Sequence, residues 1–136
     1  MGREPVIVLD THVLVRWVSG SGRLSARAKR AIERSARQRA VAASAISVLE
    51  IATAVRCGRL ALGVPLDRWL ADLYALPELQ FLPVSAAIAQ LAGGFDDSMP
   101  GDPADRIIAA TALTLGADIV TADERLHDCP QVSAVW

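Results

Sequence analysis

The sequence predicts an α/β fold, a three-layer sandwich with a mostly parallel central sheet. Short apolar runs rich in β-branched residues alternate with segments of helical periodicity. No hairpin signal such as Asn-Gly joins these runs, and several are apolar on both faces, as strands of a buried parallel sheet are. The chain has 136 residues, of which 52% are hydrophobic and 21% charged. We therefore expect one domain over residues 1–136, with a substantial core.

The predicted elements follow from these patterns. The expected strands are residues 6–9, 41–46, 79–84 and 118–121. The expected helices are residues 25–39, 47–57, 66–76, 85–92 and 103–115. Glycines predict three of the helix ends, with Gly58, Gly116 and the Gly93-Gly94 pair following their helices. Pro103 suits the first position of the last helix.

The charge is unevenly distributed along the chain. The net charge is −1, but residues 1–40 carry nine Arg or Lys and three acids, and the remainder is correspondingly acidic. A polyanion such as RNA is one possible partner of this basic section, and an ordinary solvated helix face is the alternative. The basic residues predicted to contact RNA are Arg27, Lys29, Arg30, Arg34 and Arg37.

Acidic residues follow the predicted strands or begin the predicted helices. Asp10 and Asp123 come just after strands, Asp102 and Asp105 open one helix, and Glu50 lies in the first turn of another. Ligands of parallel α/β sheets bind beyond the carboxyl ends of the strands, and the helices that follow begin at that same edge. We therefore expect these acids to converge in one crevice.

Each acid also has a structural interpretation. Asp10 could simply end a strand, and Glu50 fits a capping box with the serine three residues before it. Asp102 fits a helix N-cap, Asp105 an acid favoured by the helix dipole, and Asp123 the cap of a short final helix. The structural interpretation is stronger for each acid alone, whereas their shared edge favours a functional cluster.

Clustered carboxylates have a chemical requirement. Ionised carboxylates held close together repel one another, so some pKa values rise or a cation binds between them. Oxygen ligands of this kind suit Mg²⁺, with Mn²⁺ as a substitute. Such a metal can activate a water and stabilise the transition state of phosphodiester hydrolysis without a nucleophilic side chain. The acids therefore predict a metal-dependent nuclease.

Other chemistries lack their motifs. The sequence has no Walker A loop, no Gly-x-Gly-x-x-Gly and no Gly-x-Ser-x-Gly. The two histidines and two cysteines, His12, His127, Cys57 and Cys129, have no zinc-ligand spacing. No apolar run approaches the roughly 18 residues that span a bilayer, and the N-terminus is unlike a signal peptide. We expect a cytoplasmic protein without membrane association.

Polar residues beside the acids have possible supporting roles. Thr11 and Thr121 could orient a carboxylate or a metal-bound water, although Thr121 also suits a strand. His12 could contact substrate, whereas a lone histidine more commonly packs or bonds locally. Arg106 follows Asp105 directly, so the helix directs it elsewhere, toward a neighbouring acid or a phosphate.

Five segments of the sequence form a recognisable series: VLDTH at 8–12, LS at 24–25, SAISVLEIA at 44–52, GDPADRIIAATAL at 101–113 and IVTAD at 119–123. In this order and rough spacing they resemble the PIN-domain family, and in particular VapC-type toxins of bacterial toxin–antitoxin pairs. The resemblance covers nearly the whole chain.

This resemblance implies a specific site and activity. It assigns the four family acids to Asp10, Glu50, Asp105 and Asp123, and it places Asp102 near the metal. It implies a Mg²⁺-dependent endoribonuclease that cuts structured RNA such as tRNA or rRNA. It further implies a homodimer and a cognate antitoxin whose C-terminal segment covers the groove. Asp10 and Asp105 would be the primary metal ligands.

The sequence departs from the family pattern at a few positions. The family often has Asn or Ser after the Asp-Thr pair, whereas this chain has His12, a variant also seen in the family. Gly101 precedes Asp102, where the family usually has a basic residue or His. Residues 95–101 add two further acids, Asp96 and Asp97, which we expect near the site. The alternative to a nuclease is a non-catalytic PIN-like scaffold that binds a protein or RNA partner, and the complete set of acids favours the enzyme.

Overall fold

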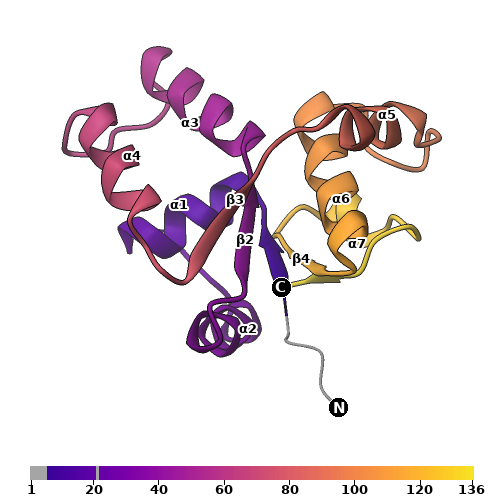
Figure 1. Ribbon diagram of the computed structural model, residues 1–136, viewed down its shortest axis with the longest axis horizontal. Helices are drawn as coiled ribbons and strands as arrows, with labels where there is room; N and C mark the ends of the chain where they lie inside the picture. The colour runs from indigo at the N-terminus through magenta and orange to yellow at the C-terminus, as the bar shows by residue number, and fades with distance from the viewer. Residues whose placement is uncertain (1–5, 21) are drawn as a thin grey trace.

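A parallel sheet flanked by helices organises the chain (Figure 1). The computed structural model describes residues 6–20 and 22–136. The elements in chain order are β1 (Ile7–Leu9), α1 (Thr11–Ser19), α2 (Ala26–Arg37), β2 (Val41–Ser44), α3 (Ile46–Arg56), α4 (Leu66–Tyr74), β3 (Leu79–Leu82), α5 (Ala86–Gly94), α6 (Pro103–Leu115), β4 (Asp118–Val120), α7 (Glu124–His127) and β5 (Ala134–Val135). The strand order is β3-β2-β1-β4-β5, and every neighbouring pair is parallel. The predicted α/β architecture is confirmed.

Alternate residues of the strands pack into two different cores. Ile7 and Leu9 of β1 face a core built with α1, α2, α3 and α4, whereas Val8 faces a core built with α6 and α7. In Figure 1, α1 and α4 lie on one side of the sheet, and α5, α6 and α7 lie on the other. Because both faces of β1 are covered, its side chains are apolar throughout, which is the pattern that predicted a buried strand.

The order of the strands determines where a ligand can bind. From β1 the chain proceeds through β2 and β3 toward one edge of the sheet, and then crosses back to place β4 on the other side of β1. Helices that leave β1 and β4 therefore diverge to opposite faces, which opens a crevice at the carboxyl ends of these two strands. Asp10 follows β1 there, and Thr121 follows β4.

Local sequence signals fix the ends of α6. The Asp102 carboxylate accepts the backbone N–H groups of Ala104 and Asp105, at 2.8 and 3.3 Å, and satisfies donors that the first helical turn leaves free. Pro103 occupies the first turn, where no hydrogen-bonding N–H is needed. Gly116 ends the helix with a φ of 63°, a conformation that glycine adopts without strain. The predicted boundaries of this helix are confirmed.

The prediction missed two elements of the fold and misplaced the ends of two others. α1 and β5 were not predicted, because the valines and tryptophan of α1 have weak helix propensity and β5 has only two residues. α5 continues through Gly93 and Gly94, although this pair predicts an end before it, and α3 begins at Ile46 inside the predicted second strand. Both cysteines are free. In the described part of the chain, no helix has the length and apolar character needed to cross a bilayer.

Candidate active site

Asp10 lies at the carboxyl end of β1, beside the end of β4. Leu9 pairs with Val120, so the next residues, Asp10 and Thr121, are neighbours at the edge of the sheet. The Thr121 hydroxyl donates to Asp10 Oδ2 at 2.6 Å, and the Thr11 N–H donates to Asp10 Oδ1 at 2.8 Å. Asp10 is only 5% exposed. A buried carboxylate requires such donors, and these two fix its orientation toward the crevice.

Glu50 is connected to the same edge through Thr11. The Thr11 hydroxyl donates to Glu50 Oε1 at 2.5 Å and lies 2.8 Å from the Ser47 hydroxyl. Burial raises the pKa of Glu50, and the charges of Asp10 and Asp102 raise it further against the opposing Thr11 hydrogen bond. The capping box predicted for Ser47 and Glu50 was wrong, as was the first-turn position of Glu50. α3 begins earlier, at Ile46, and has no side-chain cap.

Asp105 carries the most strongly perturbed carboxyl group of the crevice. Its pKa is raised to about 7, first by burial and then by the charges of Asp10, Asp102 and Asp123, with Arg125 opposing them. A carboxyl group near neutrality among other carboxylates is the result expected where like charges converge. The convergence of acids predicted from the sequence is therefore present at Asp105.

Asp123 lies just past β4 and has a close basic neighbour. Its carboxylate caps α7 by accepting the Arg125 N–H at 2.9 Å, as the structural interpretation predicted. The Arg125 guanidinium also donates to it from Nε at 3.1 Å and from Nη2 at 2.8 Å. This side-chain hydrogen bonding lowers the pKa of Asp123. Asp123 is therefore held ionised, whereas the pKa of Asp105 across the crevice lies near neutrality.

His12 bonds locally rather than projecting freely into the crevice. Its Nε2 accepts the Ala122 N–H at 3.2 Å, and its Nδ1 lies 3.5 Å from Asp10 Oδ2. Burial lowers the pKa of His12 against the opposing charge of Asp10. A neutral imidazole that accepts through Nε2 carries its proton on Nδ1, which faces Asp10. His12 therefore joins the ends of β1 and β4 and contributes no positive charge.

One cleft contains all five predicted acids. It has a volume of about 750 Å³ and is lined by Asp10, Glu50, Asp102, Asp105 and Asp123, together with Thr11 and His12. Thr121 lies behind Asp10 and is fully buried. The lining residues that were not predicted from the sequence include Arg16 of α1, Leu49 of α3 and Arg59. The two arginines give the cleft cationic groups on the sides contributed by α1 and by the segment after α3.

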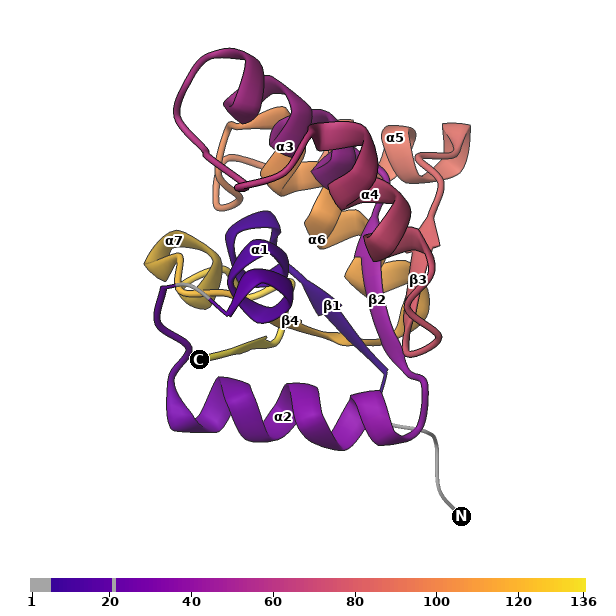
Figure 2. The ribbon, with the colours of Figure 1, turned by 90° about the vertical axis from the view of Figure 1, so that its left-hand side faces the viewer.

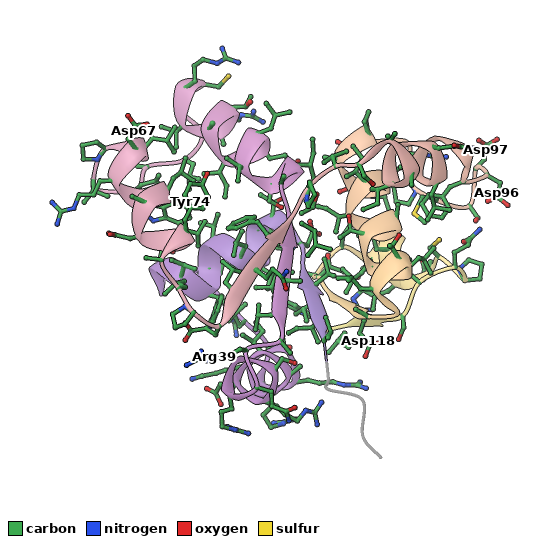
Figure 3. All side chains as sticks on the ribbon, viewed as in Figure 1. Arg39, Asp67, Tyr74, Asp96, Asp97 and Asp118 are labelled. Atoms are coloured by element: carbon green, nitrogen blue, oxygen red, sulfur yellow. The ribbon has the colours of Figure 1, made fainter. Side chains whose placement is uncertain are left out.

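The basic helix α2 lies away from this cleft. Both ribbon views show it along the edge at which the strands begin (Figures 1 and 2). Arg39 lies two residues after the end of α2, and Figure 3 shows it at that lower edge together with Asp118, the first residue of β4. None of the predicted RNA contacts on α2 lines the acidic cleft. One of them, Lys29, lines a separate neighbouring pocket of about 440 Å³ beside α1. The structure therefore does not bring these basic residues to the acids.

The two additional acids of residues 95–101 also lie elsewhere. Figure 3 shows Asp96 and Asp97 at the outer margin of the molecule beyond α5, and neither lines the cleft. Asp96 accepts the Ser98 N–H at 2.9 Å and the Ser98 hydroxyl at 2.6 Å, which stabilises a local turn. The expectation that these acids lie near the site was wrong, because the turn directs them outward.

The donors in the cleft suit a hard divalent cation, although their present geometry is open. Carboxylate oxygens from separate elements are the ligands that Mg²⁺ and Mn²⁺ prefer. Within residues 6–20 and 22–136, no three Asp, Glu, His or Cys side chains approach closely enough to hold an ion as they stand. The Arg125 guanidinium occupies the space between Asp105 and Asp123, with Nη2 at 3.3 Å and 2.8 Å from their Oδ2 atoms. The kind of donor atom in the cleft thus fits a divalent metal, and the acids would have to move closer together to enclose one.

Sequence comparison assigns the chain to a family. The PIN domain family model matches residues 7–131. The chain belongs to the PIN-domain family. Ribonuclease VapC22 of Mycobacterium tuberculosis is 36% identical over 132 residues, which cover 96% of this chain and 98% of that protein. The resemblance that the sequence motifs predicted is thereby confirmed.

Solved structures share the architecture of this PIN domain. VapBC2 from Rickettsia felis, bound to a DNA fragment from its promoter, matches with a TM-score of 0.70 at 17% identity, covering 95% of this chain and 96% of that chain. A toxin–antitoxin complex from Klebsiella pneumoniae matches with a TM-score of 0.58 at 21% identity, covering 93% and 94%. At these identities the likeness establishes the fold.

Arg106 has a structural role in this PIN domain. Its guanidinium donates from Nε to the Ala92 carbonyl at 2.9 Å, from Nη1 to the Pro100 carbonyl at 3.3 Å, and from Nη2 to the Phe95 carbonyl. The Ala92 carbonyl belongs to the last turn of α5, whose carbonyls have no partner within the helix. The predicted pairing with an acid or a phosphate was wrong. Arg106 instead fixes the segment that leads into Asp102.

Replacing Arg106 should therefore destabilise the fold. We expect Arg106→Met to lower the free energy of unfolding by about 2 kcal/mol, because half-buried carbonyls lose their donors. Arg106→Lys should recover only part of this loss, since an ammonium cannot reach three carbonyls in a fixed fork. Urea denaturation followed by circular dichroism measures both, with Arg68→Met, at an exposed position of α4, as the control. Equal stability of Arg106→Met and Arg68→Met would contradict this role.

Proposed function

We propose that this chain is a VapC-type toxin, a Mg²⁺-dependent endoribonuclease that hydrolyses phosphodiester bonds of RNA, with Mn²⁺ able to substitute. The observation that carries the proposal is the convergence of Asp10, Glu50, Asp105 and Asp123, from four separate segments, in one cleft. The relative VapC22, 36% identical over nearly the full length, is named a ribonuclease and supports the same conclusion.

The bound metal would supply Lewis acidity and a lower pKa for a coordinated water. Asp10 and Asp105 would hold it, since Asp10 is fixed by Thr121 and Thr11 and the pKa of Asp105 is raised by the very charges that a cation would neutralise. Asp123 would complete the ligand set, with Asp102 beside it.

Glu50 is the group best placed to accept a proton from the attacking water. Its pKa is raised by burial and by neighbouring acids, which suits a general base better than an ordinary carboxylate. Thr11 donates to Oε1, so the other oxygen, Oε2, remains available for a water. Thr11 thus orients Glu50, and Ser47 in turn bonds to Thr11.

The cleft also offers contacts for a polyanion. Arg16 lies above the Trp136 ring at 6.0 Å from its centroid and donates to the Arg23 carbonyl at 3.1 Å, so its position is defined. Together with Arg59 it lines the cleft that contains the acids. Phosphate contacts of this kind orient a nucleic acid without reading its sequence. We therefore assign RNA backbone binding to Arg16 and Arg59 in preference to α2.

The remaining partners follow from the relatives. Structural neighbours are VapBC and toxin–antitoxin complexes. By analogy, we propose that a cognate antitoxin binds this chain, that the chain forms a homodimer, that it acts in the cytoplasm, and that its substrate belongs to the tRNA or rRNA class. The alternative function is a non-catalytic PIN-like scaffold, which would bind a partner through the same cleft.

Cleavage of purified RNA tests the proposal. Total RNA is incubated with the protein and Mg²⁺, Mn²⁺ or EDTA, and the products are mapped by sequencing of their ends. We expect discrete cuts with either metal and none with EDTA. An absence of cuts under every condition, together with retained binding of RNA, would favour the scaffold.

A further inference from the structure

Arg125 forms an ion pair with both carboxylates that face each other across the cleft. Its Nη2 lies 2.8 Å from Asp123 Oδ2 and 3.3 Å from Asp105 Oδ2. The two acids come from different elements, since Asp105 belongs to α6 and Asp123 precedes α7. Asp123 caps α7 by accepting the Arg125 backbone N–H, which brings the Arg125 side chain close to Asp123. The cap does not explain why Nη2 also approaches Asp105.

The three side chains differ in their exposure to solvent. The side chains of Asp105 and Asp123 are 15% and 20% exposed, whereas that of Arg125 is 64% exposed. The carboxylates are thus enclosed by the fold, and the guanidinium reaches them from solvent on a flexible stem. A long exposed side chain can leave such a position at little cost in packing.

The position of Nη2 is incompatible with a shared metal. Mg²⁺ binds carboxylate oxygens at about 2.0 to 2.1 Å and tolerates little distortion. An ion that touched Oδ2 of both Asp105 and Asp123 would occupy the space in which Nη2 now lies. Among the described residues, Arg125 is also the one arginine or lysine that pairs with these acids. The Arg125 guanidinium and a metal ion therefore cannot occupy this space at the same time.

We propose that Arg125 competes with the divalent metal for Asp105 and Asp123, bridging them when no metal is bound and leaving when one enters. The inference rests on the proposed metal site. In the absence of metal the guanidinium reduces the repulsion between the two acids. The same contact lowers the affinity of the site for metal, because the ion must displace Arg125 before it can reach both oxygens.

Metal binding without RNA measures this competition. Isothermal titration with Mg²⁺, and with Mn²⁺ if Mg²⁺ binds weakly, is carried out at constant pH and ionic strength on the wild type and on Arg125→Gln. We expect the variant to bind metal about fivefold more tightly, the factor that corresponds to one exposed ion pair. Arg125→Lys should stay close to the wild type, since it retains a positive charge. Arg68→Gln, at an exposed position of α4, is the matched control for the loss of one charge.

Thermal unfolding supplies a second readout. In EDTA, Arg125→Gln should melt below the wild type, because the acids lose their cation. Saturating metal should close this difference, since the ion replaces the guanidinium in both proteins. A shift that persists unchanged in metal would show that the Arg125 side chain only holds the Asp123 carboxylate in place at the start of α7, and would overturn the competition.

The outcomes separate the inference from the proposed function. Metal binding by the wild type with equal or weaker binding by Arg125→Gln overturns the competition and leaves the nuclease proposal intact. Binding by Arg125→Gln alone supports the competition. An absence of metal binding in every variant overturns both the competition and the metal-dependent mechanism.

Discussion

The substitution Asp10→Asn should reduce RNA cleavage by about 10³-fold or more and leave the protein folded. Asp10 is the most buried acid of the cleft, and hydrogen bonds from Thr11 and Thr121 fix its carboxylate in the orientation in which it would bind a divalent ion. Loss of that charge removes several kcal/mol of transition-state stabilisation, and about 4 kcal/mol corresponds to three powers of ten in rate. The amide side chain of the variant keeps an oxygen that can accept the Thr11 N–H, so α1 retains its cap.

Asp118→Asn is the matched control for this substitution. Asp118 is the first residue of β4, the strand next to β1. Figure 3 shows it at the lower edge of the sheet, and it does not line the cleft. It is exposed, so its loss should affect neither activity nor stability. Initial rates are measured with Mg²⁺ on an RNA that the wild type cuts. Wild-type rates in Asp10→Asn would remove the metal mechanism, whereas equal losses in both variants would indicate a general effect of charge.

The sequence predicted the positions of the acids better than their interactions. Asp102 and Pro103 are local signals, so the beginning of α6 and the acids on it could be located from a few neighbouring residues. The acids Asp10 and Asp123 follow strands, and the parallel topology alone brings strand ends together. These predictions needed only the chain order and the elementary rule that strands in a parallel sheet end at one edge.

Interactions between distant segments could not be predicted in this way. Ser47 and Glu50 have the spacing of a capping box, yet Thr11 from α1 binds both side chains. That competition depends on how α1 packs against α3, which no local pattern records. Arg125 is a similar case, because its second partner, Asp105, is 20 residues away in the chain. Arg16 and Arg59 have no sequence pattern that distinguishes them from the basic residues of α2.

The separation of the basic helix α2 from the acids has a specific physical cause. α2 is strongly amphipathic, with Ala28, Ala31, Ile32 and Ser35 buried and its basic residues in water. Charge density along the sequence predicted the helix and its exposed face, but it carries no information on the edge of the sheet that the helix covers. α2 leads into β2 at the amino edge, so its charges lie at the end opposite to the acids.

Replacing Asp105 with Asn should stabilise the metal-free protein above neutral pH and abolish its activity. The pKa of Asp105 is about 7 in the folded state, against about 3.9 in an unfolded chain. The folded state therefore binds the proton more tightly, and its stability falls as the pH rises from about 4 to about 7. Three pKa units would correspond to about 4 kcal/mol, and solvent screening in the open cleft reduces this to about 2 kcal/mol.

Thermal unfolding in EDTA between pH 4 and pH 8 measures this effect. Asp105→Asn cannot ionise, so at pH 8 it should exceed the wild type by about 2 kcal/mol, and the two proteins should converge near pH 4. Added Mg²⁺ should reverse the order at pH 8, because the ion stabilises the folded wild type by binding to it and the variant has lost a ligand. A wild type that is as stable as the variant at pH 8 in EDTA would show that the acids of the cleft do not repel one another. The negative charge that destabilises the metal-free fold is the same charge that would attract a metal ion. This titration therefore tests the electrostatic basis of both the stability effect and the metal site.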